Sequence, residues 1–150
     1  IRRLLQMCIR DRTSTTVVES GYMIAHVTAS ALASENKTLA HPASVDSLTT
    51  SGGQEDLVSM APWAGQKLQS IQKNLSTILA VELIVAGAAN ALASSAMQAG
   101  RGTDPVITLL ETYCAYRTGD RPLASEINSV AHCIQSGLLL KTVSQAIHLE

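Results

Sequence analysis

Residues 64–93, AGQKLQSIQKNLSTILAVELIVAGAANALA, place apolar side chains at steps of three and four residues. The apolar positions are Ala64, Leu68, Ile71, Leu75, Ile78, Val85 and Ala89, and Glu82 falls on the same stripe between Ile78 and Val85. This spacing predicts one long amphipathic helix whose apolar stripe packs against other helices. The most apolar part, residues 78–93, is shorter than the roughly 20 residues that a membrane span requires, so we expect a buried helix and no membrane.

Signals on both sides of this stretch set its expected limits. Ser51-Gly52-Gly53-Gln54 matches a capping box, in which a Ser oxygen and a Gln side chain satisfy free backbone donors at a helix start. The long helix is therefore expected to begin near Gln54. Before it, residues 39–53 contain Pro42 and many Ser, Thr and Gly residues, which predict an irregular loop.

The remaining segments also carry helical patterns. Residues 17–37 contain no proline and have helical spacing, which predicts a first helix. After a break at Gly100, Gly102 and Pro105, residues 106–117 predict another helix, and a final amphipathic segment begins at Ala124. The predicted fold class is all-α, a bundle of long helices.

Composition excludes several function classes. The net charge of −1 offers no basic surface for phosphate groups, so we expect no nucleic-acid partner. The three cysteines are an odd number without C-x-x-C spacing, which argues against a disulfide scaffold and against a metal site. Residues 1–12 lack the apolar region of a signal peptide. Together these features favour a cytoplasmic protein.

Four blocks of sequence resemble the histidine ammonia-lyase family in its order and spacing. They are SGYMIA at 20–25, ALASENK at 31–37, LAHPASVDS at 39–47 and QEDLVSM at 54–60. A weaker echo, DRPLA, stands at 120–124. Four ordered blocks are far more specific than one short motif. The resemblance implies the C-terminal part of an ammonia-lyase fold, in a cytoplasmic homotetramer.

The resemblance also implies a chemistry. Enzymes of this family remove ammonia from an amino acid without oxidation, and histidine would give urocanate. They use a methylidene-imidazolone electrophile that forms from an Ala-Ser-Gly tripeptide, and this sequence contains no such tripeptide. We therefore expect residues 13–150 to be a segment of a longer lyase that is inactive alone, and residues 1–12 to be a leader foreign to the family, a possible artefact of sequencing.

Three residues are candidates for the active site by resemblance. Glu55 matches the family's active-site carboxylate, although an acid here is also what the first turn of a helix favours. Met23 and His26 match substrate-binding positions one helical turn apart. Met23 would otherwise fill the core. His26 stands where histidine lyases usually have Gln, and Leu57 where they commonly have His.

Alternatives of two kinds remain at this point. The first is a tyrosine or phenylalanine ammonia-lyase or an aminomutase of the same family, and Glu55 favours the histidine type because relatives acting on uncharged rings tend to carry Gln there. The second is a non-catalytic helical interaction module, because the segment lacks the electrophile. The expected ligand is a small molecule, the amino acid substrate, and no metal is expected.

Overall fold

The computed structural model describes residues 20–92, 99–116 and 119–148. These ranges form five α-helices and one short 3-10 helix. They are α2 (Met23–Leu39), η1 (Ser51–Gly53), α3 (Ala61–Leu92), α4 (Asp104–Glu111), α5 (Ala124–Gln135) and α6 (Leu138–Ala146). No strand forms within these ranges, where the β-type pairing is an isolated bridge between Thr50 and Glu55. The all-α prediction is confirmed.

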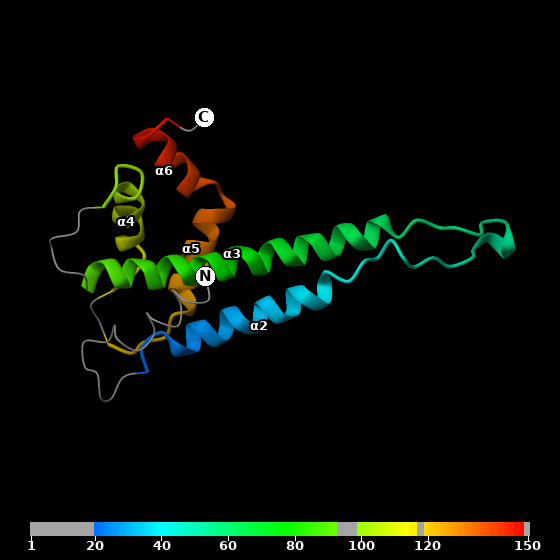
Figure 1. The fold of residues 1–150 in the computed structure, drawn as a ribbon, viewed down its shortest axis with the longest axis horizontal. Helices are drawn as coiled ribbons and strands as arrows, with labels where there is room; N and C mark the ends of the chain where they lie inside the picture. The colour runs from blue at the N-terminus through cyan, green and yellow to red at the C-terminus, as the bar shows by residue number, and fades with distance from the viewer. Residues whose placement is uncertain (1–19, 93–98, 117–118, 149–150) are drawn as a thin grey trace.

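The molecule is elongated, with a helical body at one end and an arm at the other (Figure 1). The arm is residues 40–60, the connection between α2 and α3. α2 and α3 lie side by side and meet the arm at one end, while α4 and α5 contact α3 and α6 packs against α4 and α5. α3 contains 32 residues, a length of about 48 Å at 1.5 Å per residue. It is therefore the axis on which the other helices are arranged.

The hydrophobic core surrounds the second half of α3. Its most completely buried side chains on this helix are Ala80, Val81, Ile84 and Ala88. α2 contributes buried alanines, α5 contributes Val130, α4 contributes Leu110, and the chain after α4 adds Cys114 and Tyr116. Small side chains on facing helices allow their backbones to approach closely. The prediction of a buried helix over residues 78–93 is confirmed as far as residue 92.

The first half of α3 is much less covered. Trp63 and Leu68 are each 55% exposed and Leu75 is 48% exposed. α3 is also long and apolar enough for a membrane span, with a mean hydropathy of 1.8 over 18 residues, of which 39% are buried. A helix at the core of a globular protein has the same composition. The apolar stripe thus extends along the whole helix, but the described residues cover only part of it.

The predicted start of α3 near Gln54 is wrong, because the helix begins at Ala61. Ser51, Gly52 and Gly53 adopt left-handed φ values of 55°, 66° and 91°, and this run forms a tight turn instead of a cap. The actual start follows Ser59, whose Oγ accepts a hydrogen bond of 3.3 Å from the Ala61 N–H. Pro62 then occupies the first turn, where its missing N–H leaves no bond unmade.

Three other helix limits differ from the predictions. α2 begins at Met23, and residues 17–19 lie outside the described ranges. α4 spans Asp104–Glu111, so Pro105 lies in its first turn instead of preceding the helix, and the helix ends six positions before the predicted residue 117. The predicted final segment forms two helices, α5 and α6. Gly137, which lies between them, has a φ of 74° and interrupts the helix.

Candidate functional site

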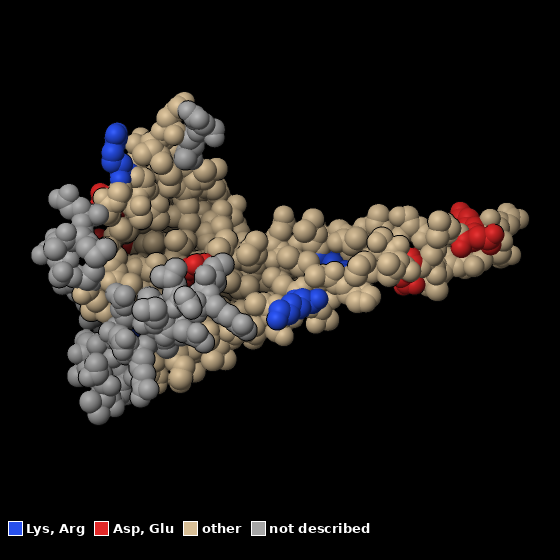
Figure 2. Space-filling model, in the orientation of Figure 1, with Lys and Arg blue, Asp and Glu red and all other residues tan. Residues whose placement is uncertain are grey.

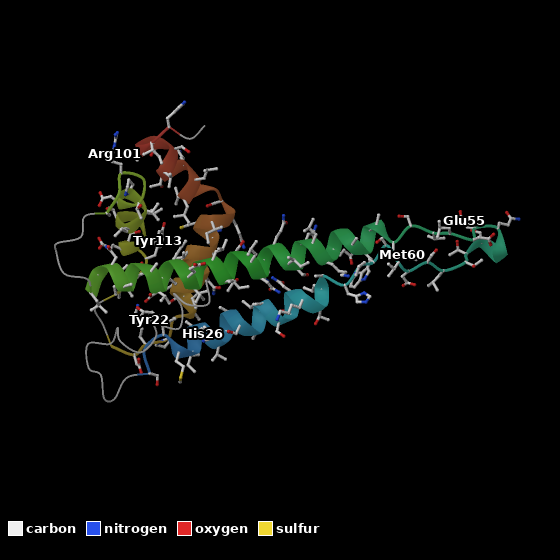
Figure 3. The ribbon with its side chains drawn as sticks, viewed as in Figure 1. Tyr22, His26, Glu55, Met60, Arg101 and Tyr113 are labelled. Atoms are coloured by element: carbon white, nitrogen blue, oxygen red, sulfur yellow. The ribbon has the colours of Figure 1, made fainter. Side chains whose placement is uncertain are left out.

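Glu55 lies at the tip of the arm (Figure 3). It pairs with Thr50 across the turn: the Thr50 N–H donates to the Glu55 carbonyl at 3.0 Å, and the Glu55 N–H donates to the Thr50 carbonyl at 3.3 Å. The Thr50 hydroxyl also donates to Glu55 Oε2 at 2.6 Å. Both residues are exposed. The backbone and carboxylate of Glu55 are therefore held in place while the second carboxylate oxygen remains accessible.

Two further sets of hydrogen bonds stabilise the arm between its tip and α3. The Val58 N–H donates to Ser47 Oγ at 2.8 Å, and the Ser47 hydroxyl donates to the Val58 carbonyl at 3.2 Å. Nearer the body, Lys67 Nζ on α3 donates to the carbonyl of His41. The two sides of the arm are thus joined at two successive levels, and a third contact joins the base of the arm to α3. This explains how a segment whose only regular element is the three-residue 3-10 helix η1 can present Glu55 in a defined place.

The expectation that Glu55 stands at a helix N-terminus is wrong. Glu55 lies six positions before Ala61, where α3 begins, so its carboxylate is beyond the short range over which the dipole of α3 is effective. The neighbour of the carboxylate is the Thr50 hydroxyl. Asp56 is exposed beside it, and acidic side chains mark the tip in Figure 2.

Met23 and His26 lie at the other end of the molecule. They occupy the first turn of α2, where Met23 is 47% exposed and His26 is half-buried. In Figure 3 His26 lies in the body end of the structure and Glu55 at the opposite extreme of the long axis. One chain therefore does not bring the three candidate residues together. A common site containing all of them requires more than one copy of the chain.

A polar cluster surrounds the start of α2 and joins residues about 100 positions apart. The Ser20 and Gly21 N–H groups donate to the two carboxylate oxygens of Asp120 at 2.7 and 2.9 Å. Arg121 donates two hydrogen bonds to Glu126, Nε to Oε1 at 2.7 Å and Nη2 to Oε2 at 2.8 Å. The sequence predicted for Asp120 and Arg121 only a weak match to a family motif, because no pattern in the neighbouring residues indicates a contact with residues 20 and 21.

The Tyr22 side chain belongs to the same cluster. It is buried, which raises the pKa of its phenol, while a hydrogen bond with Arg121 opposes that rise. The guanidinium of Arg121 has its own pKa raised, first by the hydrogen bond with Glu126. Tyr22 is the residue directly before α2. The cluster therefore contacts the beginning of the helix through both backbone and side chain.

A second buried cluster contains Tyr116 and Cys114, and its role is packing. The Tyr116 hydroxyl fills the space beside Gly87 on α3, so that a Cβ at position 87 would overlap it. Burial raises the pKa of Tyr116 well above its usual value and also raises the pKa of the neighbouring Cys114 thiol. Among the described residues the Tyr116 hydroxyl has no well-formed hydrogen bond. These groups are packing elements that stay protonated at neutral pH.

Within the described ranges, no three His, Cys, Asp or Glu side chains lie together as metal ligands. The hollows are open grooves. One of about 430 Å³ lies at the base of the arm beside Leu57 and Met60, and one of about 630 Å³ lies between α3 and α5 beside Leu75, Leu79 and Ile134. Neither groove contains Glu55, Met23 or His26. A third groove, of about 710 Å³, lies beside the start of α2 and Asp120, and it does not contain these three residues either. These grooves therefore do not bring the candidate residues together.

Comparison with known proteins places these features in context. The family model described as aromatic amino acid lyase matches residues 5–112, a range that begins inside the expected leader. The chain is 46% identical over 126 residues to a histidine ammonia-lyase of Idiomarina loihiensis, covering 84% of this chain and 24% of that protein. The chain thus spans about a quarter of the length of this curated relative.

Two solved structures resemble the fold. A histidine ammonia-lyase from Trypanosoma cruzi superposes with a TM-score of 0.82 at 34% identity, covering 97% of this chain and 29% of that one. A tyrosine aminomutase from Streptomyces globisporus superposes with a TM-score of 0.85 at 25% identity, covering 91% of this chain and 26% of that one. The arrangement of α2, the arm and α3 is therefore an arrangement found in such enzymes.

Proposed function

The chain belongs to the aromatic amino acid lyase family, and on this premise we propose that it is a segment of a histidine ammonia-lyase that converts L-histidine to urocanate. The observation that carries this proposal is the accessible carboxylate of Glu55, held at the tip of the arm by Thr50. Similarity to histidine ammonia-lyases at 46% identity supports the same substrate. The full-length protein, the product of the complete reading frame, would perform the reaction.

In this reaction the C–N bond to the amine breaks, a proton leaves the neighbouring β-carbon, and a double bond forms between the two carbons. A methylidene-imidazolone group, formed in another part of the full-length protein, would supply the electrophile that makes the amine a better leaving group. This chain contains no Ala-Ser-Gly from which that group forms, so its own residues have supporting roles. The proposed role of Glu55 is to bind the cationic part of the substrate or to accept a proton, because a carboxylate anion can do either.

We propose that the site is completed in a homotetramer. Glu55 and His26 lie at opposite ends of one chain (Figure 3), so a second copy is needed to place Met23 and His26 near a Glu55 carboxylate. The half-exposed apolar residues Leu68 and Leu75 provide a surface for such an assembly. Burial of this apolar area in other copies would favour association.

An aminomutase is the second candidate within the family. It is favoured by the similarity to the tyrosine aminomutase structure, whereas Glu55 favours the histidine type. A non-catalytic helical module is the candidate of a different class. The cytoplasm is the proposed location, supported by the free thiols of Cys114 and Cys133, and neither a nucleic acid nor a membrane is part of the proposal.

The test is to express the full-length protein and incubate it separately with L-histidine, L-tyrosine and L-phenylalanine. Urocanate absorbance with L-histidine alone is the expected result. Conversion of L-tyrosine to its β-isomer would support the aminomutase, and an unreactive protein whose complete sequence lacks Ala-Ser-Gly would support the non-catalytic module. The 150-residue chain is the negative control, since we expect no turnover without the electrophile.

A further inference from the structure

The start of α2 is held by a residue from a distant part of the sequence. Consecutive N–H groups of Ser20 and Gly21 point at one carboxylate, that of Asp120, with one oxygen for each donor. Gly21 has a φ of 58°, a left-handed conformation that aims neighbouring N–H groups toward a common acceptor. Hydrogen bonds to an ionised acceptor are stronger than those between neutral groups. Asp120 therefore fixes the backbone immediately before the helix.

α2 has no cap of its own that would perform this task. Its N-cap position is Tyr22, which makes no side-chain capping bond. The Tyr22 phenol instead interacts with Arg121, and Arg121 is oriented by the two hydrogen bonds that it donates to Glu126. A planar guanidinium bound at two points to a carboxylate has little freedom to turn. Two adjacent residues, Asp120 and Arg121, thus hold three consecutive residues at the helix start.

This arrangement acts on the first turn of α2, where Met23 and His26 are located. Met23 is 47% exposed, so packing of its own side chain does not fix its place. Its position follows from the backbone on which it stands, and that backbone is set by the contacts to Asp120 and Arg121. A displacement of about 1 Å at a binding group is enough to weaken an enzyme strongly.

We propose that Asp120 and Arg121 are positioning residues that set the place and rotation of the first turn of α2, and with them the presentation of Met23 and His26 to the amino acid substrate. The proposal rests on the proposed function, which assigns Met23 and His26 to the substrate pocket. The competing explanation is that the cluster contributes only to stability. The two explanations differ in the kinetic constant that they change.

The test uses Asp120→Ala and Asp120→Asn in the full-length enzyme. Loss of positioning at a binding surface raises KM for L-histidine, by about tenfold in Asp120→Ala, with kcat lowered less than about threefold. Asp120→Asn retains one acceptor oxygen and is expected to lie between this variant and the wild type. Asp104→Ala is the matched control, because it removes an exposed acid from the first turn of α4 and should lower Tm while leaving KM within about twofold.

Hydrogen exchange of the peptide covering residues 20–26 gives a second readout that needs no activity. Faster exchange is expected in Asp120→Ala and not in Asp104→Ala. Unchanged exchange would show that Asp120 does not hold the helix start. Faster exchange with an unchanged KM would reduce the cluster to a stabilising role and overturn the proposal. A wild-type enzyme inactive on L-histidine would instead overturn the proposed function, whatever the exchange result.

Discussion

The Thr50 hydroxyl donates a hydrogen bond of 2.6 Å to Oε2 of Glu55 at the tip of the arm. The same two residues exchange both backbone hydrogen bonds across the turn. Because the turn is closed by these three bonds, the side chain of Glu55 starts from a fixed backbone and has one oxygen already engaged. A group held in this way loses less conformational entropy when it binds a substrate.

Glu55→Gln in the full-length enzyme is expected to lower kcat for L-histidine by about a hundredfold or more. This is the usual effect of losing a group that accepts a proton or binds the cationic part of the substrate. Gln can still accept a hydrogen bond from Thr50, so the arm should keep its structure. Glu111→Gln is the control, since it removes an exposed charge from α4. Steady-state kinetics and thermal melts of both variants measure the difference, and near-normal turnover of Glu55→Gln would refute the proposed role.

Two glycines of α3 should respond in opposite directions to alanine. A Cβ at Gly87 would overlap the buried Tyr116 hydroxyl, whereas nothing lies within 4 Å of a Cβ at Gly65. Gly87→Ala is expected to lower the free energy of unfolding by about 1–3 kcal/mol through overpacking. Gly65→Ala should raise it by about 0.5–1 kcal/mol through higher helix propensity. Chemical denaturation of the full-length protein checks both, and equal effects would contradict the packing of Tyr116.

Alkaline pH should destabilise the fold through Tyr22, Cys114 and Tyr116, whose pKa values burial raises above 10.0 for the phenols and 9.0 for the thiol. At higher pH the unfolded chain loses protons that the folded chain keeps, so the free energy of unfolding falls. Each group contributes a slope of up to about 1.4 kcal/mol per pH unit. Tyr116→Phe should make Tm fall less steeply between about pH 9 and 11. An unchanged slope would show that Tyr116 ionises freely when folded.

Assembly should depend on the exposed stripe of α3. Light scattering is expected to show a tetramer for the full-length protein, and Leu75→Arg is expected to shift it to smaller species, because a charge would enter a buried apolar contact. Leu75 is 48% exposed in the single chain. Thr108→Arg places the same charge at an exposed position of α4 and should leave the tetramer intact. A Leu75→Arg protein that remains tetrameric would place the interface elsewhere.

Local patterns predicted much of this protein. The spacing of apolar residues in 64–93 was sufficient for a long helix, and the ordered motifs were sufficient for the family. Both signals are local, because helix periodicity and motif spacing involve residues close in sequence. The apolar stripe did not distinguish the covered half of α3 from the half-exposed one, since exposure depends on which partners are present.

Tertiary structure alone decided where Glu55 stands. Ser51-Gly52-Gly53-Gln54 has the composition of a cap, but the left-handed φ values of its first three residues and the pairing of Thr50 with Glu55 form a turn in its place. The contact of Asp120 with Ser20 joins positions 100 residues apart. No propensity or spacing reports such a contact, because its free energy comes from two segments that meet only after the helices have packed.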